Sequence, residues 1–130
     1  MAEHPFVTLA KKGYEAFRTG DMATLGEVFA DDVVFHVPGK SILANSYQGK
    51  AATFGYFGKL FELTNGTIKV ESLNLYVSDD QVVMLDRMAA ERNGKTIDTE
   101  LVLVLKVRDG QFVEGWDHFA DLAAWDEFWA

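Results

Sequence analysis

The residues from Leu101 to Ala120 constrain the fold more than any other part of the chain. A run rich in leucine and valine ends at Val107, a polar segment around Asp109-Gly110 follows, and a second run ends at Phe119. Asp-Gly between two such runs is typical of a β-hairpin, because glycine accepts the positive φ that tight turns require. The first run is apolar on both faces, which predicts a central strand covered on each side.

The second arm of this hairpin, Phe112 to Phe119, carries polar side chains into a mostly apolar molecule. It includes Glu114, Asp117 and His118, next to a tryptophan and between two phenylalanines. Ionisable groups on a strand that packs against a core are candidates for catalysis or binding, because burial changes their pKa values.

Length and composition predict a globular protein with one core. A chain of 130 residues is too short for two cores, so we expect a single domain over residues 1–130. The 48% hydrophobic content excludes a disordered chain. No apolar run reaches the ~20 residues of a membrane span, and the first residues lack the pattern of a signal peptide. We therefore expect a cytoplasmic protein without a membrane partner.

The net charge and the scarcity of metal-ligating residues argue against nucleic-acid binding and against a metal site. A net charge of −8 without a basic patch repels phosphate backbones, so nucleic acid is not an expected partner. There is no cysteine, and the three histidines are not clustered with carboxylates, so no metal site is predicted. We expect any chemistry to proceed without a cofactor.

Hydrophobic periodicity changes once along the chain. The first half repeats at about 3.6 residues, as in helices, and the second half alternates, as in strands. This order predicts an α+β fold in which a curved antiparallel sheet carries three helices on its concave side. We expect a first helix with an apolar stripe from Phe6 to Phe17, helices over Met22–Ala30 and Lys50–Leu63, strands over Val33–Val37, Thr67–Val77, Gln81–Arg92, Lys95–Val107 and Phe112–Phe119, a short edge strand near Tyr47, and a last helical turn after Asp121.

Four segments carry a resemblance to a known superfamily. They are YEAFRTGD (Tyr14–Asp21), FADDVVFHVPG (Phe29–Gly39), YQGKAA (Tyr47–Ala52) and VRDGQFVEGWDHF (Val107–Phe119). In this order and spacing the chain resembles the nuclear transport factor two-like superfamily, in its SnoaL-like and ketosteroid-isomerase-like branch. The resemblance implies a cystatin-like roll with a cone-shaped apolar pocket for a small hydrophobic ligand, and a homodimer through the outer sheet face. It does not imply one reaction, since the superfamily includes isomerases, dehydratases, epoxide hydrolases, cyclases and non-enzymes.

The resemblance also shows which catalytic groups this chain lacks. The position of the isomerase's general base is Val37, and that of its protonated acid is about Leu103. The position of its first-helix tyrosine falls near Gly13, beside Tyr14. Without the base and the acid, steroid isomerisation by that mechanism is not expected.

Two aspartates are the first candidates for proton transfer. By the resemblance Asp117 points into the cone, where desolvation would raise its pKa and suit a general base or acid. Strand parity groups Asp86 with Met84 and Met88, and the resemblance implies that this side faces inward, so the two acids would lie in one pocket and share a proton. The structural alternatives are that Asp117 pairs with a histidine or a backbone group, and that Asp86 pairs with Arg87 or a lysine.

Histidines and tyrosines are secondary candidates. His36 and His118 would act with Asp117 or orient it, although His36 is out of phase with Val37 and the two cannot both face the pocket without a bulge. Tyr14 and Tyr56 would donate hydrogen bonds to an enolate, or else belong to the core. The residues expected to line the pocket are Phe17, Phe35, Val37, Tyr56, Phe57, Leu60, Met88, Leu103, His118 and Phe119.

These observations favour binding of a compact, largely apolar carbonyl compound. If the protein is an enzyme, Asp117 moves a proton next to the carbonyl group, in isomerase, cyclase or dehydratase chemistry. The alternative is a non-catalytic module of the same fold that binds a small molecule or serves dimerisation.

Overall fold

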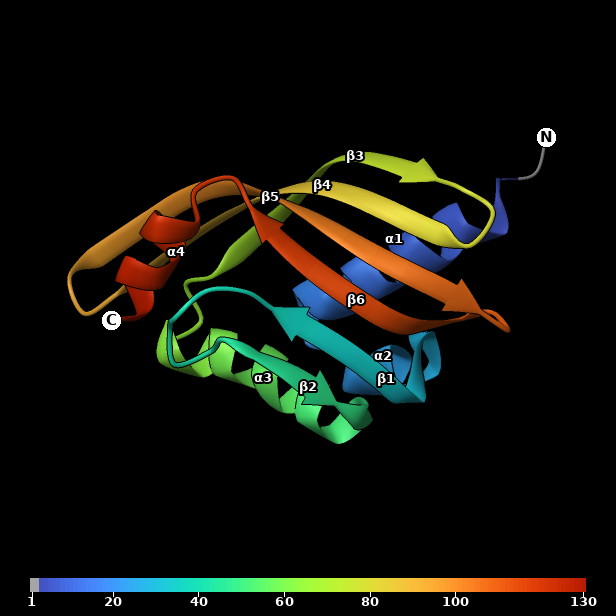
Figure 1. Cartoon of the computed structure of the whole chain (residues 1–130), viewed down its shortest axis with the longest axis horizontal. Helices are drawn as coiled ribbons and strands as arrows, with labels where there is room; N and C mark the ends of the chain where they lie inside the picture. Colours follow the sequence, from blue (N-terminus) through green and yellow to red (C-terminus); the bar gives the residue numbers. More distant parts are fainter. Residues whose placement is uncertain (1–2) are drawn as a thin grey trace.

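A computed structural model describes residues 3–130, which form four helices and six strands (Figure 1). In chain order these are α1 (Pro5–Thr19), α2 (Met22–Val28), β1 (Phe29–Val37), β2 (Asn45–Gln48), α3 (Gly49–Leu63), β3 (Lys69–Val77), β4 (Gln81–Arg92), β5 (Lys95–Arg108), β6 (Gln111–Phe119) and α4 (Leu122–Trp129).

The strands form one open, curved sheet in the order β2-β1-β6-β5-β4-β3. Figure 1 shows α1 and α3 on the same side of this sheet, with α4 beside the turn that joins β4 to β5. The predicted α+β architecture is therefore confirmed. The sheet is mixed, because β1 runs parallel to β6 while the other neighbouring strands are antiparallel.

The turns follow from residues that tolerate positive φ. At the β4–β5 turn Asn93 and Gly94 have φ of 51° and 77°, and at the β5–β6 turn Asp109 and Gly110 have 53° and 76°. Two consecutive positive φ values match the twist of the strands in a two-residue hairpin. Both predicted hairpins are confirmed, and β5 lies mid-sheet between β4 and β6.

Two strand boundaries differ from the prediction by two residues or more. β1 begins at Phe29 instead of Val33, because Phe29 is already extended (φ −97°, ψ 139°) and α2 ends at Val28. β3 begins at Lys69 instead of Thr67, because the Thr67 amide donates to the Thr64 carbonyl in the turn that follows α3. Both differences arise where a helix passes into a strand.

The core lies between the inner face of the sheet and the helices. Side chains of α1 and α3 pack on inner-face residues of the strands, and Trp125, Phe128 and Trp129 of α4 are fully buried at one end. None of the helices within residues 3–130 is long and apolar enough to cross a lipid bilayer.

The two faces of β5 differ in their cover. Leu101 and Leu105 on the inner face are buried, whereas Val102 and Val104 on the outer face are only half-buried. The expected cover on both sides is therefore present on one side only in the isolated chain.

Candidate functional site

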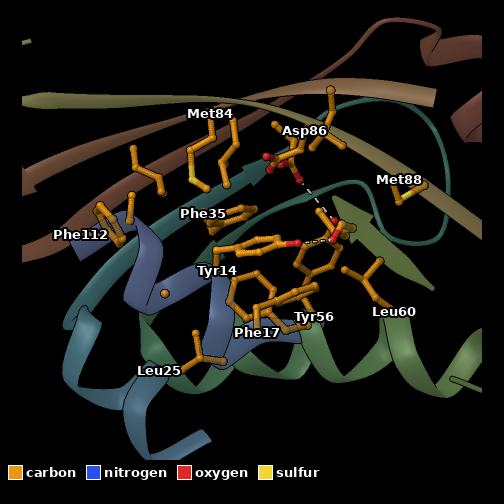
Figure 2. A pocket seen from close by; sticks show the side chains of 18 of the residues that line it. Tyr14, Phe17, Leu25, Phe35, Tyr56, Leu60, Met84, Asp86, Met88 and Phe112 are labelled. Carbon is orange, nitrogen blue, oxygen red and sulfur yellow. Dashed lines mark hydrogen bonds between the residues drawn. The ribbon is translucent and has the colours of Figure 1, made fainter. Parts of the chain in front are cut away.

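A cavity of about 100 Å³ lies between the inner face of the sheet and helices α1 and α3. Figure 2 shows Met84, Asp86 and Met88 extending from the sheet toward the aromatic side chains of Tyr14 and Tyr56. The lining is almost entirely hydrocarbon and aromatic. The predicted lining residues that contribute to it are Phe17, Phe35, Tyr56, Phe57, Leu60, Met88, Leu103 and Phe119.

Two carboxyl groups face this cavity from strands on either side of β5. Asp86 of β4 is 3% exposed and Asp117 of β6 is 7% exposed. In register Asp86 lies opposite Leu101 of β5, and Asp117 lies opposite Leu103. Leu101 and Leu103 are two residues apart on β5 and therefore share a face of the sheet. The two carboxyl groups opposite them lie on this same inner face, next to aliphatic side chains.

Burial changes the protonation of both acids. Desolvation raises the pKa of Asp117 to about 7, against a hydrogen bond from Tyr56 that lowers it, and the nearby charge of Asp86 raises it further. Desolvation also raises the pKa of Asp86 to about 6. Asp86 Oδ1 is buried without a hydrogen-bond partner among residues 3–130. Near neutral pH the pair therefore exchanges protons with little cost in free energy.

The two tyrosines have different partners. The Tyr56 hydroxyl donates to Asp117 Oδ2 at 3.3 Å. Burial raises the pKa of Tyr56 well above its usual value, so this hydroxyl stays protonated. The Tyr14 hydroxyl donates to the Val70 carbonyl oxygen at 2.8 Å. Tyr56 is therefore bonded to the acidic pair, and Tyr14 to the backbone of β3.

His36 and His118 lie on the opposite face of the sheet, which corrects their predicted role. His36 Nε2 is 2.7 Å from Glu114 Oε2, and His36 Nδ1 is 2.7 Å from Ser46 Oγ. His118 is exposed and lies opposite Val102 on the outer face. The cause is strand alternation: the register shift in β1 lies between Phe29 and Val34, so no bulge turns His36 inward.

Val37 is buried on the inner face but lies outside the cavity lining, which also corrects the prediction. The predicted pairing of Asp86 with Arg87 is excluded too. Arg87 points away from it and holds Asp98 with two hydrogen bonds of 2.8 and 2.6 Å. Asp117 has no histidine partner within the described chain, because both nearby histidines face outward.

Some of the lining was not predicted. Trp125 of α4 lines the cavity and stacks on Phe119 with ring centroids 3.8 Å apart. Leu105, Met84 and Phe112 also contribute. The alternation that places Asp86 and Leu103 inward also places Met84 and Leu105 there, so parity was a usable signal for these two. No local pattern places α4 against β6. The described residues contain no cluster of histidine and acidic side chains able to hold a metal ion.

A family model and a full-length relative match this chain. Residues 10–115 match the model of the SnoaL-like domain. The uncharacterized protein Rv0034 of Mycobacterium tuberculosis is 32% identical over the full length of both chains.

Three solved structures share the fold. Bal32a, from a soil-derived mobile gene cassette, is 39% identical with a TM-score of 0.95 over 97% of both chains. A protein of unknown function with a cystatin-like fold from Xanthomonas campestris is 32% identical with a TM-score of 0.90, over 95% of this chain and 97% of that one. TerC, co-crystallized with polyporic acid, is 22% identical with a TM-score of 0.84, over 96% and 98%; at this identity the likeness concerns the fold alone.

Proposed function

Since the chain belongs to the SnoaL-like domain family, we propose that it binds a small, largely apolar carbonyl compound and moves a proton next to the carbonyl group without a cofactor. One observation carries the proposal: two buried carboxyl groups with raised pKa values face an otherwise hydrocarbon cavity. A general base works best when its pKa lies near the operating pH. The reaction would be an isomerisation, cyclisation or dehydration.

The acidic pair supplies both halves of such a step. Because a charge on Asp86 raises the pKa of Asp117, the pair carries one proton over part of the range near neutral pH. The ionised carboxyl then removes the proton from the carbon beside the carbonyl, and the protonated one gives a proton to the enolate oxygen. Tyr56 remains a donor throughout and holds the Asp117 carboxyl in place. The apolar walls exclude water that would otherwise compete for these protons.

One structural neighbour and the aromatic lining of the cavity support the binding of a small organic molecule. TerC was co-crystallized with polyporic acid, so a protein with this architecture is found with a small organic molecule. In this chain, the aromatic rings of Phe35, Tyr56 and Phe57 lie within 6 Å of one another, centroid to centroid, and line the cavity. They offer flat apolar surfaces to a ring or an unsaturated chain.

The test does not require the natural substrate. Small cyclic ketones are incubated with the protein in deuterated water, and deuterium uptake beside the carbonyl is followed by NMR. We expect uptake above the buffer rate, lost in Asp117→Asn and kept in His36→Gln, a matched change on the outer face. Equal uptake in wild type and Asp117→Asn would refute the role of Asp117.

A second candidate function is binding without catalysis in the same cavity. The observation in its favour is that the two positions that would carry the isomerase acids, Val37 and Leu103, are apolar. Retention of small ketones by a protein that never exchanges their protons would support it.

We also propose that the protein forms a homodimer through the outer face of the sheet. This face carries half-buried apolar side chains on its three central antiparallel strands, including Leu85, Val104 and Trp116. In the isolated chain they form an apolar patch of the kind that marks protein interfaces.

A further inference from the structure

We infer that the ligand is no larger than a single small ring and combines a hydroxyl hydrogen-bond donor with a carbonyl acceptor, as in the enol form of a small vicinal diketone. The inference rests on the proposed function and names the chemical class that its site would take. Three features of the cavity carry it: its size, an unpartnered carboxyl oxygen and an unpartnered indole N–H.

The size limits the ligand. The cavity measures about 100 Å³, whereas an apolar cavity of about 150 Å³ in another protein holds benzene. Protein interiors are packed to crystal density and do not open without cost in free energy. The cavity therefore holds at most one small ring, and a polycyclic molecule does not fit.

The unpaired oxygen of Asp86 is complemented by a hydrogen-bond donor on the ligand. Asp86 is 3% exposed, lines the cavity, and its Oδ1 has no hydrogen-bond partner among the residues that the structure describes. Leaving a buried polar oxygen unpaired costs free energy, and a group from a ligand that donates a hydrogen bond removes this cost. A hydroxyl or enol of the ligand supplies it.

The unpaired indole N–H of Trp125 is complemented by a hydrogen-bond acceptor on the ligand. Trp125 is 1% exposed, lines the same cavity, and its Nε1 is likewise unpartnered within residues 3–130. An indole N–H only donates, so its complement is an oxygen such as a carbonyl. Trp129 Nε1 and Thr53 Oγ1 are also unpartnered, but neither residue lines the cavity, so they say nothing about its ligand.

Strand register and ring stacking link the two residues that carry the unpaired groups. Asp86, Leu101 and Phe119 form one row across β4, β5 and β6, and Trp125 stacks on Phe119 at 3.8 Å. A single small molecule can therefore meet both groups. An enolised vicinal diketone carries its hydroxyl and its carbonyl on adjacent carbons, which suits such a site.

The same class fits the proposed proton transfer with a balanced step. The carboxylate of the pair takes a proton from the carbon beside one carbonyl of the diketone, and its electrons form the carbon–carbon double bond of the enol. The protonated carboxyl gives its proton to the oxygen of that carbonyl. The ligand has exchanged a C–H for an O–H, and the pair again holds one proton.

Four ring-sized probes separate the contributions. The enol form of vicinal cyclohexanedione offers both groups, phenol offers the donor, cyclohexenone the acceptor, and benzene neither. We expect calorimetry or ligand-observed NMR to rank the enol tightest, with each hydrogen bond worth about five-fold in affinity. Asp86→Leu should weaken the enol and phenol but not benzene, and Trp125→Phe should weaken the enol and cyclohexenone relative to benzene.

The outcomes distinguish this inference from the proposed function. If all four probes bind equally well, the donor and acceptor requirement is overturned while the apolar pocket of the proposed function stands. If the affinities follow the predicted order but no probe exchanges deuterium, the ligand class stands and catalysis does not. If none binds, both are overturned. Circular dichroism of each variant, with its urea midpoint, shows whether a lost affinity reflects a lost fold.

Discussion

Replacing Asp117 with asparagine should stabilise the protein above neutral pH and change little at acid pH. Asparagine has nearly the same shape and keeps an oxygen that can accept the hydrogen bond from Tyr56, but it carries no charge to bury. The natural carboxyl is 7% exposed, and burial raises its pKa from 3.8 to about 7. The folded protein therefore resists ionisation of this group, and the variant removes that resistance.

The sign and size of the change in unfolding free energy follow from the pKa values of Asp117 in the unfolded and folded states. Between pH 3.8 and about 7 the folded state keeps a proton that the unfolded state has lost, so the free energy of unfolding falls as pH rises through this window. About three pKa units at ~1.36 kcal/mol each give roughly 4 kcal/mol as the full effect above pH 7. Any constant cost of burying the amide cancels when the difference between variant and wild type is compared across pH.

The assay is urea unfolding followed by tryptophan fluorescence from acid to alkaline pH. A matched control is Asp98→Asn, in an exposed ion pair with Arg87, whose hydrogen bond lowers the pKa of Asp98. Its stabilising contribution is present above the unfolded pKa and is lost at low pH, so this variant should lose stability at high pH. If Asp117→Asn follows the control, or gains nothing above pH 7, the carboxyl is not the buried acid that the proposed mechanism needs.

Further changes test the neighbours of the pair and the two faces of the sheet. Tyr56→Phe removes a hydrogen bond that favours ionised Asp117 and should raise the pKa of Asp117. Asp86→Asn removes a nearby negative charge and should lower the pKa of Asp117. Carbon-13 NMR titration of the Asp117 carboxyl would measure both shifts, and shifts in the same direction would contradict the described environment. Gly115→Ala places a methyl group 2.8 Å from the Phe35 ring and should cost about 1–3 kcal/mol in urea unfolding; an unchanged midpoint would contradict this packing. Val104→Glu places a charge in the proposed dimer interface and should yield monomers by light scattering, and an unchanged mass would argue against that interface.

Local rules predict the second half of the chain well. Asn93-Gly94 and Asp109-Gly110 are the two hairpin turns, and alternation along β4 places Asp86 on the inner face as expected. These features depend on neighbours in sequence, because turn conformation and strand parity are local properties. Parity alone groups Asp86 with Met84 and Met88, whereas the expectation that this face and Asp117 point into the cavity came from the family resemblance.

Features that depend on distant strands could not be predicted in the same way. His36 conflicts in parity with Val37, and only the pairing of β1 with β6 settles which of the two faces inward. That pairing also brings Glu114 within hydrogen-bond distance of His36, a contact between residues 78 positions apart. Likewise Trp125 enters the cavity because α4 folds back onto Phe119, which no pattern inside α4 indicates.

The residues of β5 that lie opposite the two acids help to explain their raised pKa values. β5 separates the strands of Asp86 and Asp117, and it presents Leu101 and Leu103 directly opposite them. Side chains with a donor at these positions would hydrogen-bond the carboxylates, favour ionisation and lower both pKa values. Aliphatic side chains leave each acid with burial and little compensation, and Tyr56 offers a single long hydrogen bond to one of them. The doubly apolar run that marks β5 in the sequence is thus what keeps the two carboxyl groups ready to exchange a proton near neutral pH.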